Sequence, residues 1–439
     1  MQKTDVIVIG AGVAGLTASL FLAKSALKVK LIESKNFIGG RTFSIKDPNA
    51  FFDLDNGQHL FAGAYENYFE FLKQINSFKY IKFQKGIDIT FIDLQKNKNV
   101  LNTGFIPGKL GILVGFLKYN ALSFNQKFKI LNLLFKINKN AQNLNYKSVK
   151  NFLEVFKQDE KIIQYFWEPL CLAVMNNDIE NSDFEVFRNV LFKLFLSNSN
   201  FSKLAYSTVP LSKLYENFED IFKKYQGELI LSEKIIDVEF GDDYIISVLS
   251  KNNKYIADYF IFAVPPYVIY KLFKDKIAFK SEFAYSTIIS AYIDYNFSYD
   301  LNELIGAIGT NIHWIFNRNK FYTGNSFNNN LSIAVTISAA NKFNDFTNSE
   351  IKEIILNELS TLFDDLRFKS PIFFKLIKDK RATPMINFKS KELRFNKLPN
   401  LKNVFFAGDW TDTKLPATIE GACQSGINCM KEIVKYYKD

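Results

Sequence analysis

A short run of β-branched apolar residues, Val6–Ile9, begins the most informative pattern in the chain. A glycine turn, Gly10–Gly15, follows it directly, and apolar residues with helical spacing come next. A second apolar run, Val29–Ile32, ends at the acidic residue Glu33. Buried parallel strands have continuous apolar runs, whereas helices repeat their apolar positions about every 3.6 residues. The order strand, glycine turn, helix and strand therefore predicts a βαβ unit.

Apolar runs of the same character return far along the chain, at 229–231, 259–264 and 404–407. Strands of this kind can join the first two only if the chain returns to the same sheet. We therefore expect an α/β fold with a discontinuous dinucleotide-binding domain made of residues 1–85, 205–280 and 385–439. A second, mixed α+β domain is expected from the mainly helical segment 86–204 and the strand-rich segment 281–384.

The glycine turn predicts a site for the pyrophosphate of a dinucleotide. Gly10 allows the tight turn, Gly12 lets the backbone approach the phosphates, and Gly15 lets helix and strand pack closely. The N-terminus of the next helix offers unpaired N–H groups and a partial positive charge. Glu33 lies 18 residues after Gly15, near the roughly 20 expected for a carboxylate that binds a ribose 2′-OH. The alternative is a glycine turn that serves only close packing.

Further motifs identify the dinucleotide. Gly39-Gly40-Arg41 places a fixed cation where it can meet a phosphate oxygen. Asp53–His59 supplies polar groups, and a late strand ends at Gly408-Asp409. The helix expected after Thr418 would direct its positive end at negative charge on a reduced flavin ring. Because such motifs occur at both ends of the chain, we expect one long cofactor, FAD rather than NAD.

These motifs resemble those of the FAD-dependent amine oxidase and carotenoid desaturase superfamily, over essentially the whole chain. Within it the chain is most similar to the squalene-associated branch, the hydroxysqualene dehydroxylases. The branch is indicated by the segments Asp55–His59, Trp167–Cys171 and Gly408–Gly421. The resemblance implies a Rossmann-like FAD-binding domain of the amine oxidase type, beside a substrate domain that takes a polyisoprenoid.

The motifs and the resemblance together assign the cofactor ligands by position. The candidates are Gly10, Gly12, Val13, Ala14, Gly15, Glu33, Gly40, Arg41, Gly57, Gln58, Val238, Gly408, Asp409, Ala417, Thr418 and Ile419. Val238 is included because a backbone group at this position meets the adenine in the superfamily. No metal site is expected, because two histidines and three cysteines show no metal-ligand spacing.

The resemblance implies an FAD-dependent reductase that removes the hydroxyl of hydroxysqualene to give squalene, in squalene and hopanoid synthesis. Hydride passes from reduced flavin to an allylic carbon and the hydroxyl leaves as water, so an acid is needed beside it. Asp55 and His59 are the candidates for this proton donor. The alternative is that Asp55 caps a turn and His59 is a hydrogen-bonded core imidazole. An electron donor for the flavin is a further expected partner.

Two other functions stay open. A carotenoid or phytoene desaturase would move hydride the other way, from hydrocarbon to oxidised flavin. A non-catalytic isoprenoid-binding protein would use a related fold without flavin. The intact Gly10–Gly15, Gly39–Arg41 and Gly408–Trp410 motifs disfavour the second of these functions.

Composition restricts the partners and the cellular location expected for the protein. The net charge is +10, but the lysines are scattered and no nucleic-acid-binding motif occurs, so no nucleic-acid partner is expected. Few cysteines and the immediate start of the βαβ unit predict a cytoplasmic protein. The segment 105–137 mixes apolar residues with lysines. It predicts either contact with the inner face of the cytoplasmic membrane or amphipathic helices that cover the substrate domain.

Overall fold

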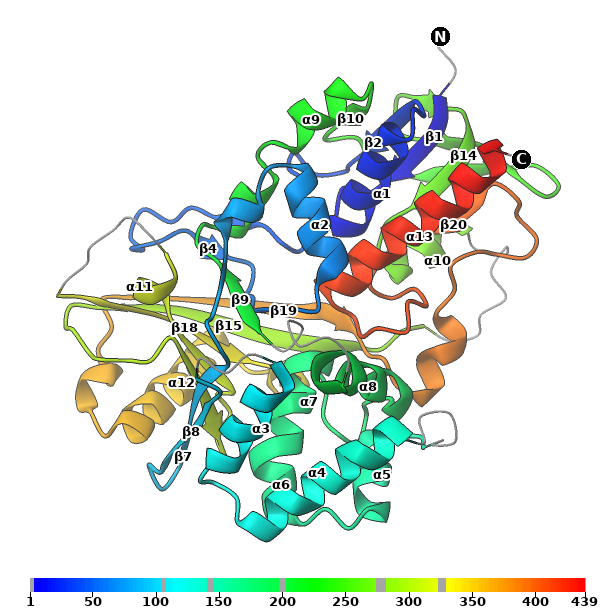
Figure 1. Ribbon diagram of the computed structural model, residues 1–439. Coiled ribbons are helices and arrows are strands. Elements are labelled where there is room, and N and C mark those ends of the chain that lie inside the picture. The colour runs from blue at the N-terminus through cyan, green and yellow to red at the C-terminus, as the bar shows by residue number, and fades with distance from the viewer. Residues whose placement is uncertain are drawn as a thin grey trace.

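A computed structural model describes residues 4–104, 108–139, 146–196, 203–273, 282–322 and 329–438. Its first sheet has five parallel strands in the order β10-β2-β1-β14-β20 (Figure 1). The strands are β1 (Thr4–Ile9), β2 (Val29–Ile32), β10 (Glu228–Ile230), β14 (Ala257–Phe262) and β20 (Val404–Phe406). The predicted βαβ unit is confirmed as β1, α1 (Val13–Lys24) and β2.

The last helix, α13 (Ile419–Lys438), packs directly against α1 (Figure 1). Gly426 permits this approach, because a Cβ there would lie 2.4 Å from the carbonyl oxygen of Ala14. Gly15 has the same effect at the start of α1, where a Cβ would lie 1.9 Å from the carbonyl oxygen of Gly10. Backbone therefore contacts backbone at both glycines, and the two ends of the chain lie side by side.

A second sheet has seven strands in the order β19-β15-β18-β17-β16-β7-β8. Its neighbours pair antiparallel, except for the parallel pair of β16 and β7. The strands are β7 (Asp88–Asp93), β8 (Lys98–Asn102), β15 (Tyr285–Tyr295), β16 (Leu304–Ile308), β17 (Trp314–Asn317), β18 (Leu331–Ile337) and β19 (Phe373–Pro384). Helix α12 (Asn348–Phe363) packs on one face, and its Ile351 and Ile355 belong to the same buried cluster as Ile289 and Ile293 of β15.

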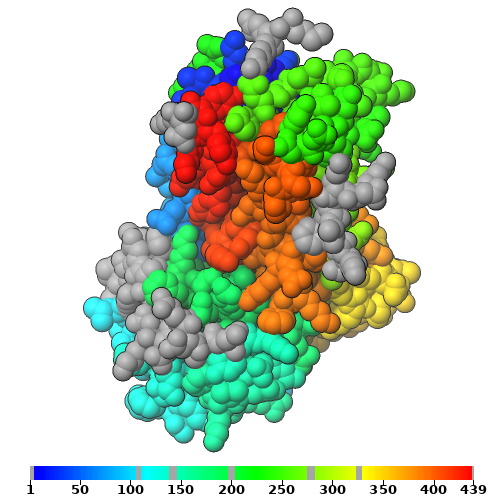
Figure 2. Space-filling model, turned by 90° about the vertical axis from the view of Figure 1, so that its right-hand side faces the viewer, coloured from blue at the N-terminus to red at the C-terminus, as the bar shows by residue number. Residues whose placement is uncertain are grey.

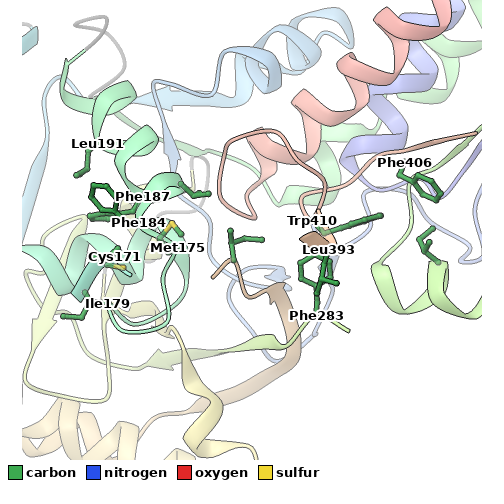
Figure 3. Close-up of a cluster of buried hydrophobic side chains, with 14 of the residues drawn as sticks. Cys171, Met175, Ile179, Phe184, Phe187, Leu191, Phe283, Leu393, Phe406 and Trp410 are labelled. Carbon is green, nitrogen blue, oxygen red and sulfur yellow. The ribbon is translucent and has the colours of Figure 1, made fainter. Parts of the chain in front are cut away.

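A helical layer lies beside this sheet (Figure 1). Its helices are α3 (Gly108–Lys118), α4 (Phe124–Lys139), α5 (Val149–Val155), α6 (Glu160–Ile162), η2 (Ile163–Trp167), α7 (Glu168–Met175), α8 (Phe184–Leu191) and η3 (Phe192–Leu196). Figure 3 shows Cys171 and Met175 near Phe184 and Phe187 in the buried cluster of this layer. The segment 86–204 is thus helical only after the β7–β8 hairpin, which joins the second sheet because its apolar residues are buried there.

Shorter elements complete the fold. They are β3 (Ser44–Ile45), β4 (Leu54–Asp55), β5 (Phe61–Ala62), α2 (Glu66–Gln74), η1 (Phe78–Tyr80), β6 (Ile81–Phe83), β9 (Leu204–Ser207), η4 (Leu211–Tyr215), α9 (Phe218–Lys224), β11 (Asp237–Phe240), β12 (Ile245–Leu249), β13 (Lys254–Tyr255), α10 (Pro266–Phe273), α11 (Arg318–Phe321), η6 (Ala340–Phe343), η7 (Leu366–Lys369) and η8 (Phe388–Leu393). Strands β11 and β12 form an antiparallel pair.

The C-terminal part of the chain connects the two sheets. Figure 2 shows it in orange and red, running between the green segment near the first sheet and the blue-green helical layer. The Asp183 N–H at the start of α8 donates to the carbonyl oxygen of Ile386 at 3.0 Å. Lys391 of η8 pairs with Glu185 of α8 at 2.8 Å. These contacts fix the helical layer relative to the strand β20 that follows.

Candidate functional site

A cavity of about 1110 Å³ lies at the carboxyl ends of the strands of the first sheet. Gly10 lines it just after β1, Glu33 after β2, Ala263 after β14 and Gly408 two residues after β20. Ligands of open α/β sheets bind outside this edge. Since most small-molecule pockets measure about 300–1,000 Å³, this cavity has room for a dinucleotide and part of a second ligand.

Two helices begin at this cavity. Val13 and Ala14 of α1 line it, as do Ala417, Thr418 and Ile419 at the start of α13. Gly12, the N-cap of α1, provides no side-chain cap, so the first N–H groups of the helix are available to a ligand. These two helix N-termini give the cavity a positive potential that suits phosphates and an anionic ring.

The glycines let backbone approach backbone beside the first helix. A Cβ on Gly40 would lie 2.9 Å from the Gly12 Cα, and Gly40 has a φ of +65°. The Gly39 N–H donates to the carbonyl oxygen of Ala11 at 2.8 Å, which ties the two turns together. The result is a shallow cradle of main chain without side chains, as a pyrophosphate requires.

Glu33 is buried at the edge of the cavity. One carboxylate oxygen, Oε2, accepts from the Ala11 N–H at 2.7 Å. The other, Oε1, accepts from the Lys35 N–H at 2.8 Å. The carboxylate therefore orders the glycine turn and still has lone pairs for a ribose hydroxyl.

Arg41 and Asp409 come from opposite ends of the sequence and meet at the cavity. The guanidinium Nη2 lies 2.7 Å from Asp409 Oδ1, and Nη1 donates to the carbonyl oxygen of Ala382 at 2.5 Å. The Asp409 side chain is buried, whereas Arg41 keeps 43% of its side-chain surface accessible. Asp409 thus holds the cation in place while further N–H donors remain for a phosphate.

The loop Asn56–His59 lines the cavity, but Asp55 does not. The Asp55 carboxylate points the other way, where it accepts from Ser44 Oγ at 2.6 Å, the Leu211 N–H at 3.0 Å and Tyr322 OH at 3.0 Å. Burial raises the pKa of Asp55 above its usual value. The observed position is that of a carboxylate that orders turns, and it does not support Asp55 as the proton donor.

His59 lies on the cavity wall, so of the two candidates for the proton donor it is the one that lines the cavity. Its Nδ1 is 2.5 Å from the carbonyl oxygen of Gly57, and because a carbonyl only accepts, Nδ1 carries the hydrogen. Burial lowers the pKa of His59. The ring is therefore mainly neutral at pH 7, and it can donate from Nε2 only after it takes up a proton.

Two other candidate residues do not line the cavity. Val238 lies in β11, buried in the main core, and does not line the cavity, whereas Ile235 just before this strand does. Gly15 also lies outside the lining, because its role is the close contact with Gly10. Gly15 therefore has the packing role expected from the sequence.

The far part of the cavity is apolar and reaches the helical layer. Its wall is formed by β7, β8, α3, α4 and α7, with the residues Ile89, Phe91, Leu101, Ile112, Leu113, Phe116, Ile130, Leu131, Leu134, Phe135, Leu170 and Val174. Leu113 and Phe135 are exposed as well as lining, so the cavity opens to the surface between α3 and α4. The cavity therefore joins a polar cradle to a long apolar channel.

Several lining residues had no signal in the sequence. Tyr285 and Ser290 of β15 and Thr336 of β18 face the cavity, yet no motif surrounds them. Both faces of these strands are buried, so alternation of polar and apolar residues does not mark the cavity side. The hydroxyl group of each residue, within an otherwise apolar strand, was the sole sequence feature that could have indicated a position facing the cavity.

The comparison with protein families decides the class. The family described as flavin containing amine oxidoreductase matches residues 13–434. The chain belongs to this family. It is an FAD-dependent oxidoreductase, and the α/β fold and the FAD cofactor expected from the sequence are confirmed. The main-chain cradle, the paired helix N-termini and the Arg41–Asp409 pair fit this cofactor.

Individual proteins that resemble this chain over most of its length share less than a quarter of its residues. A hydroxysqualene dehydroxylase of Zymomonas mobilis is 23% identical over 433 residues, covering 95% of this chain and 96% of the relative. A 15-cis-phytoene desaturase of Arabidopsis thaliana is also 23% identical, over 100% of this chain and 81% of the relative. The crystal structure of an oxidoreductase from Methanosarcina mazei superimposes with a TM-score of 0.76 at 14% identity, covering 98% and 100% of the two chains.

Removal of the Arg41 side chain is expected to weaken FAD binding. The charge-assisted hydrogen bonds of a guanidinium contribute about 1.5–3 kcal/mol, so Arg41→Ala should raise the dissociation constant roughly 10- to 100-fold. Titration of the deflavinated protein with FAD, followed by quenching of flavin fluorescence, measures the constant. Arg367→Ala is the matched control, because Arg367 also meets a carboxylate at 2.7 Å but lies outside the cavity lining. Equal affinities of the two variants would contradict this role.

Proposed function

We propose that the protein removes the hydroxyl group of hydroxysqualene and so produces squalene. The supporting observation is the single cavity that joins the flavin cradle to an apolar channel open between α3 and α4. A linear C30 isoprenoid needs such a channel, because most of its surface can bind only by apolar contact. The near full-length match with a hydroxysqualene dehydroxylase supports the same substrate.

The proposed reaction balances as a two-electron reduction. When bound, reduced flavin would supply the hydride that forms the new C–H bond at the allylic carbon as the C–O bond breaks. The oxygen takes a proton and leaves as water. An electron donor of the cell then returns two electrons to the flavin. Aromatic residues of the lining, including Trp314 and Phe316, stabilise positive charge on the allylic carbons as the oxygen leaves.

We propose that the residues lining the polar part of the cavity bind FAD. Gly10, Gly12 and Gly40 provide the cradle, and Glu33 binds the ribose. Arg41 binds phosphate, and Asp409 holds Arg41 and accepts from the ribityl chain. Two lining segments would hold the isoalloxazine ring: Gly57-Gln58-His59, and Ala417-Thr418-Ile419 at the start of α13.

The division into two domains remains a proposal. All strands of the first sheet come from residues 1–85, 205–280 and 385–439, and all strands of the second come from 86–204 and 281–384. This distribution supports a discontinuous FAD domain and a substrate domain that closes over its open edge.

A phytoene desaturase is the second candidate. The relative from Arabidopsis thaliana is as similar in sequence, and it carries this function in its name. The same channel would take its C40 hydrocarbon. The reaction would need oxidised flavin and would lengthen a polyene.

We further propose that α3 and α4 contact a membrane at the mouth of the channel. Phe124, Phe128 and Phe135 of α4 are 77%, 62% and 63% exposed, and Leu110 and Leu117 of α3 are exposed as well. The exposed Lys118 and Lys136 lie beside them, which suits the anionic inner face of the cytoplasmic membrane. None of the helices within the described residues is long and apolar enough to cross a bilayer. Residues 105–107 of the predicted contact segment lie outside the described part of the chain.

Product analysis tests the function directly. Purified holoenzyme, reduced without oxygen, should convert hydroxysqualene to squalene, and oxidised holoenzyme should not. Mass spectrometry of the extracted lipids identifies the product. Incubation of the oxidised enzyme with phytoene is the parallel reaction, and a lengthened polyene there, with no squalene from hydroxysqualene, would support the second candidate.

We propose His59, which lines the cavity, as the proton donor, and this role predicts that the reaction rate depends on pH. Since burial lowers the pKa of His59 below about 6.5, its protonated fraction rises as the pH falls. The kcat for dehydroxylation should therefore rise from pH 8 toward pH 6, and His59→Asn should lose this rise and about 100-fold in kcat. His313→Asn, outside the cavity lining, is the control. An unchanged pH profile in His59→Asn would leave His59 without this role.

Vesicle flotation tests the membrane contact. Burial of a phenylalanine side chain contributes about 1.5–3 kcal/mol, so Phe124→Ser with Phe128→Ser should weaken binding to anionic vesicles at least about tenfold. Leu366→Ser is the control, because Leu366 is 76% exposed but belongs to η7, away from the channel mouth. Equal binding of wild type and the double variant would refute the contact.

A further inference from the structure

Two hydroxyl groups lie side by side on the cavity face of the second sheet. Ser290 of β15 and Thr336 of β18 are directly opposite each other in the antiparallel register. Both residues are buried and both line the cavity. Neither Ser290 Oγ nor Thr336 Oγ1 has a hydrogen-bond partner. Buried hydroxyls nearly always find a partner, so this pair is available for a ligand.

The surroundings of this pair are apolar. Ile288 precedes Ser290 on the same face of β15, and Trp314, opposite Thr336 in the register, also lines the cavity. Leu304 and Phe316 complete this part of the wall. A wall shaped only for a hydrocarbon would have apolar side chains at these two positions as well, because unpaired hydroxyls oppose binding of an apolar group.

A third unpaired oxygen belongs to the loop that is placed beside the flavin. Gln58 lines the cavity, and its Oε1 is buried without a partner. The preceding residue lies close to Ser290, since a Cβ added at Gly57 would lie 3.4 Å from Ser290 Oγ. The hydroxyls thus lie where the polar cradle meets the apolar channel, which is where the proposed reaction on an isoprenoid would take place.

We propose that Ser290, Thr336 and Gln58 form a binding site for the hydroxyl group of the substrate. An alcohol oxygen accepts two hydrogen bonds and donates one. Ser290 and Thr336 donate to the oxygen, and Gln58 Oε1 accepts its hydrogen. These are specificity-determining residues, because they hold the C–O bond beside the flavin and remain unpaired when a hydrocarbon binds. The inference rests on the proposed function, which supplies an alcohol as substrate.

The test measures binding to oxidised holoenzyme, which cannot turn the alcohol over. Changes in the flavin absorption spectrum give dissociation constants for hydroxysqualene and squalene. In Ser290→Ala with Thr336→Val, loss of two hydrogen bonds should weaken hydroxysqualene binding about 10- to 100-fold, while squalene, which leaves both hydroxyls unpaired in wild type, should bind equally well or more tightly. Ser286→Ala is the matched control, because its hydroxyl on β15 is equally buried and unpaired but lies outside the cavity lining.

The ratio of the two affinities decides the inference. A fall of about tenfold or more in the preference for hydroxysqualene supports it, provided that flavin content and melting temperature match wild type. An unchanged ratio, or equal loss of both affinities, overturns it. Turnover of hydroxysqualene by reduced wild type is measured separately. Turnover with an unchanged ratio rejects the hydroxyl site alone, whereas no turnover rejects the proposed function.

Discussion

The close contact of α1 with α13 is the constraint on which the site depends. Gly426 brings the backbone of one helix against Ala14 of the other, and a side chain there would separate them. Because the helices are aligned in this way, both begin at the same cavity. The positive ends of two helices from opposite ends of the chain therefore act on one ligand.

The cavity combines two kinds of surface that serve opposite parts of the reaction. The cradle of glycine backbone, helix ends and Arg41 suits an anionic cofactor, whereas the channel between α3 and α4 suits a hydrocarbon. The few polar side chains at their junction are where specificity arises, since each hydrogen bond there is made in apolar surroundings. Helices α3 and α4, which enclose the channel, also carry exposed apolar side chains, so the proposed substrate entry and the proposed membrane contact would involve one structure.

The cofactor side of the site was largely predictable, because its chemistry is a property of local backbone. The turn at Gly10–Gly15 and the acid at Glu33 require only a strand, a tight turn and a helix, which neighbouring residues specify. Asp55 and Val238 show how far such prediction from the sequence reaches. Both lie near the expected motif, yet Asp55 faces Ser44 and Tyr322, and Val238 faces the core. A side chain one residue away along a strand points to the opposite face, and this register is set by distant partners.

The sequence by itself determined the βαβ unit, through residue spacing within one short segment. It also determined the FAD cofactor and the family, through the resemblance of its motifs to those of known proteins. Only the tertiary structure decided that Arg41 meets Asp409 and that Ser290 stands opposite Thr336. Such pairs join residues far apart in the chain, and their geometry arises from helix packing and strand register, which no local pattern encodes.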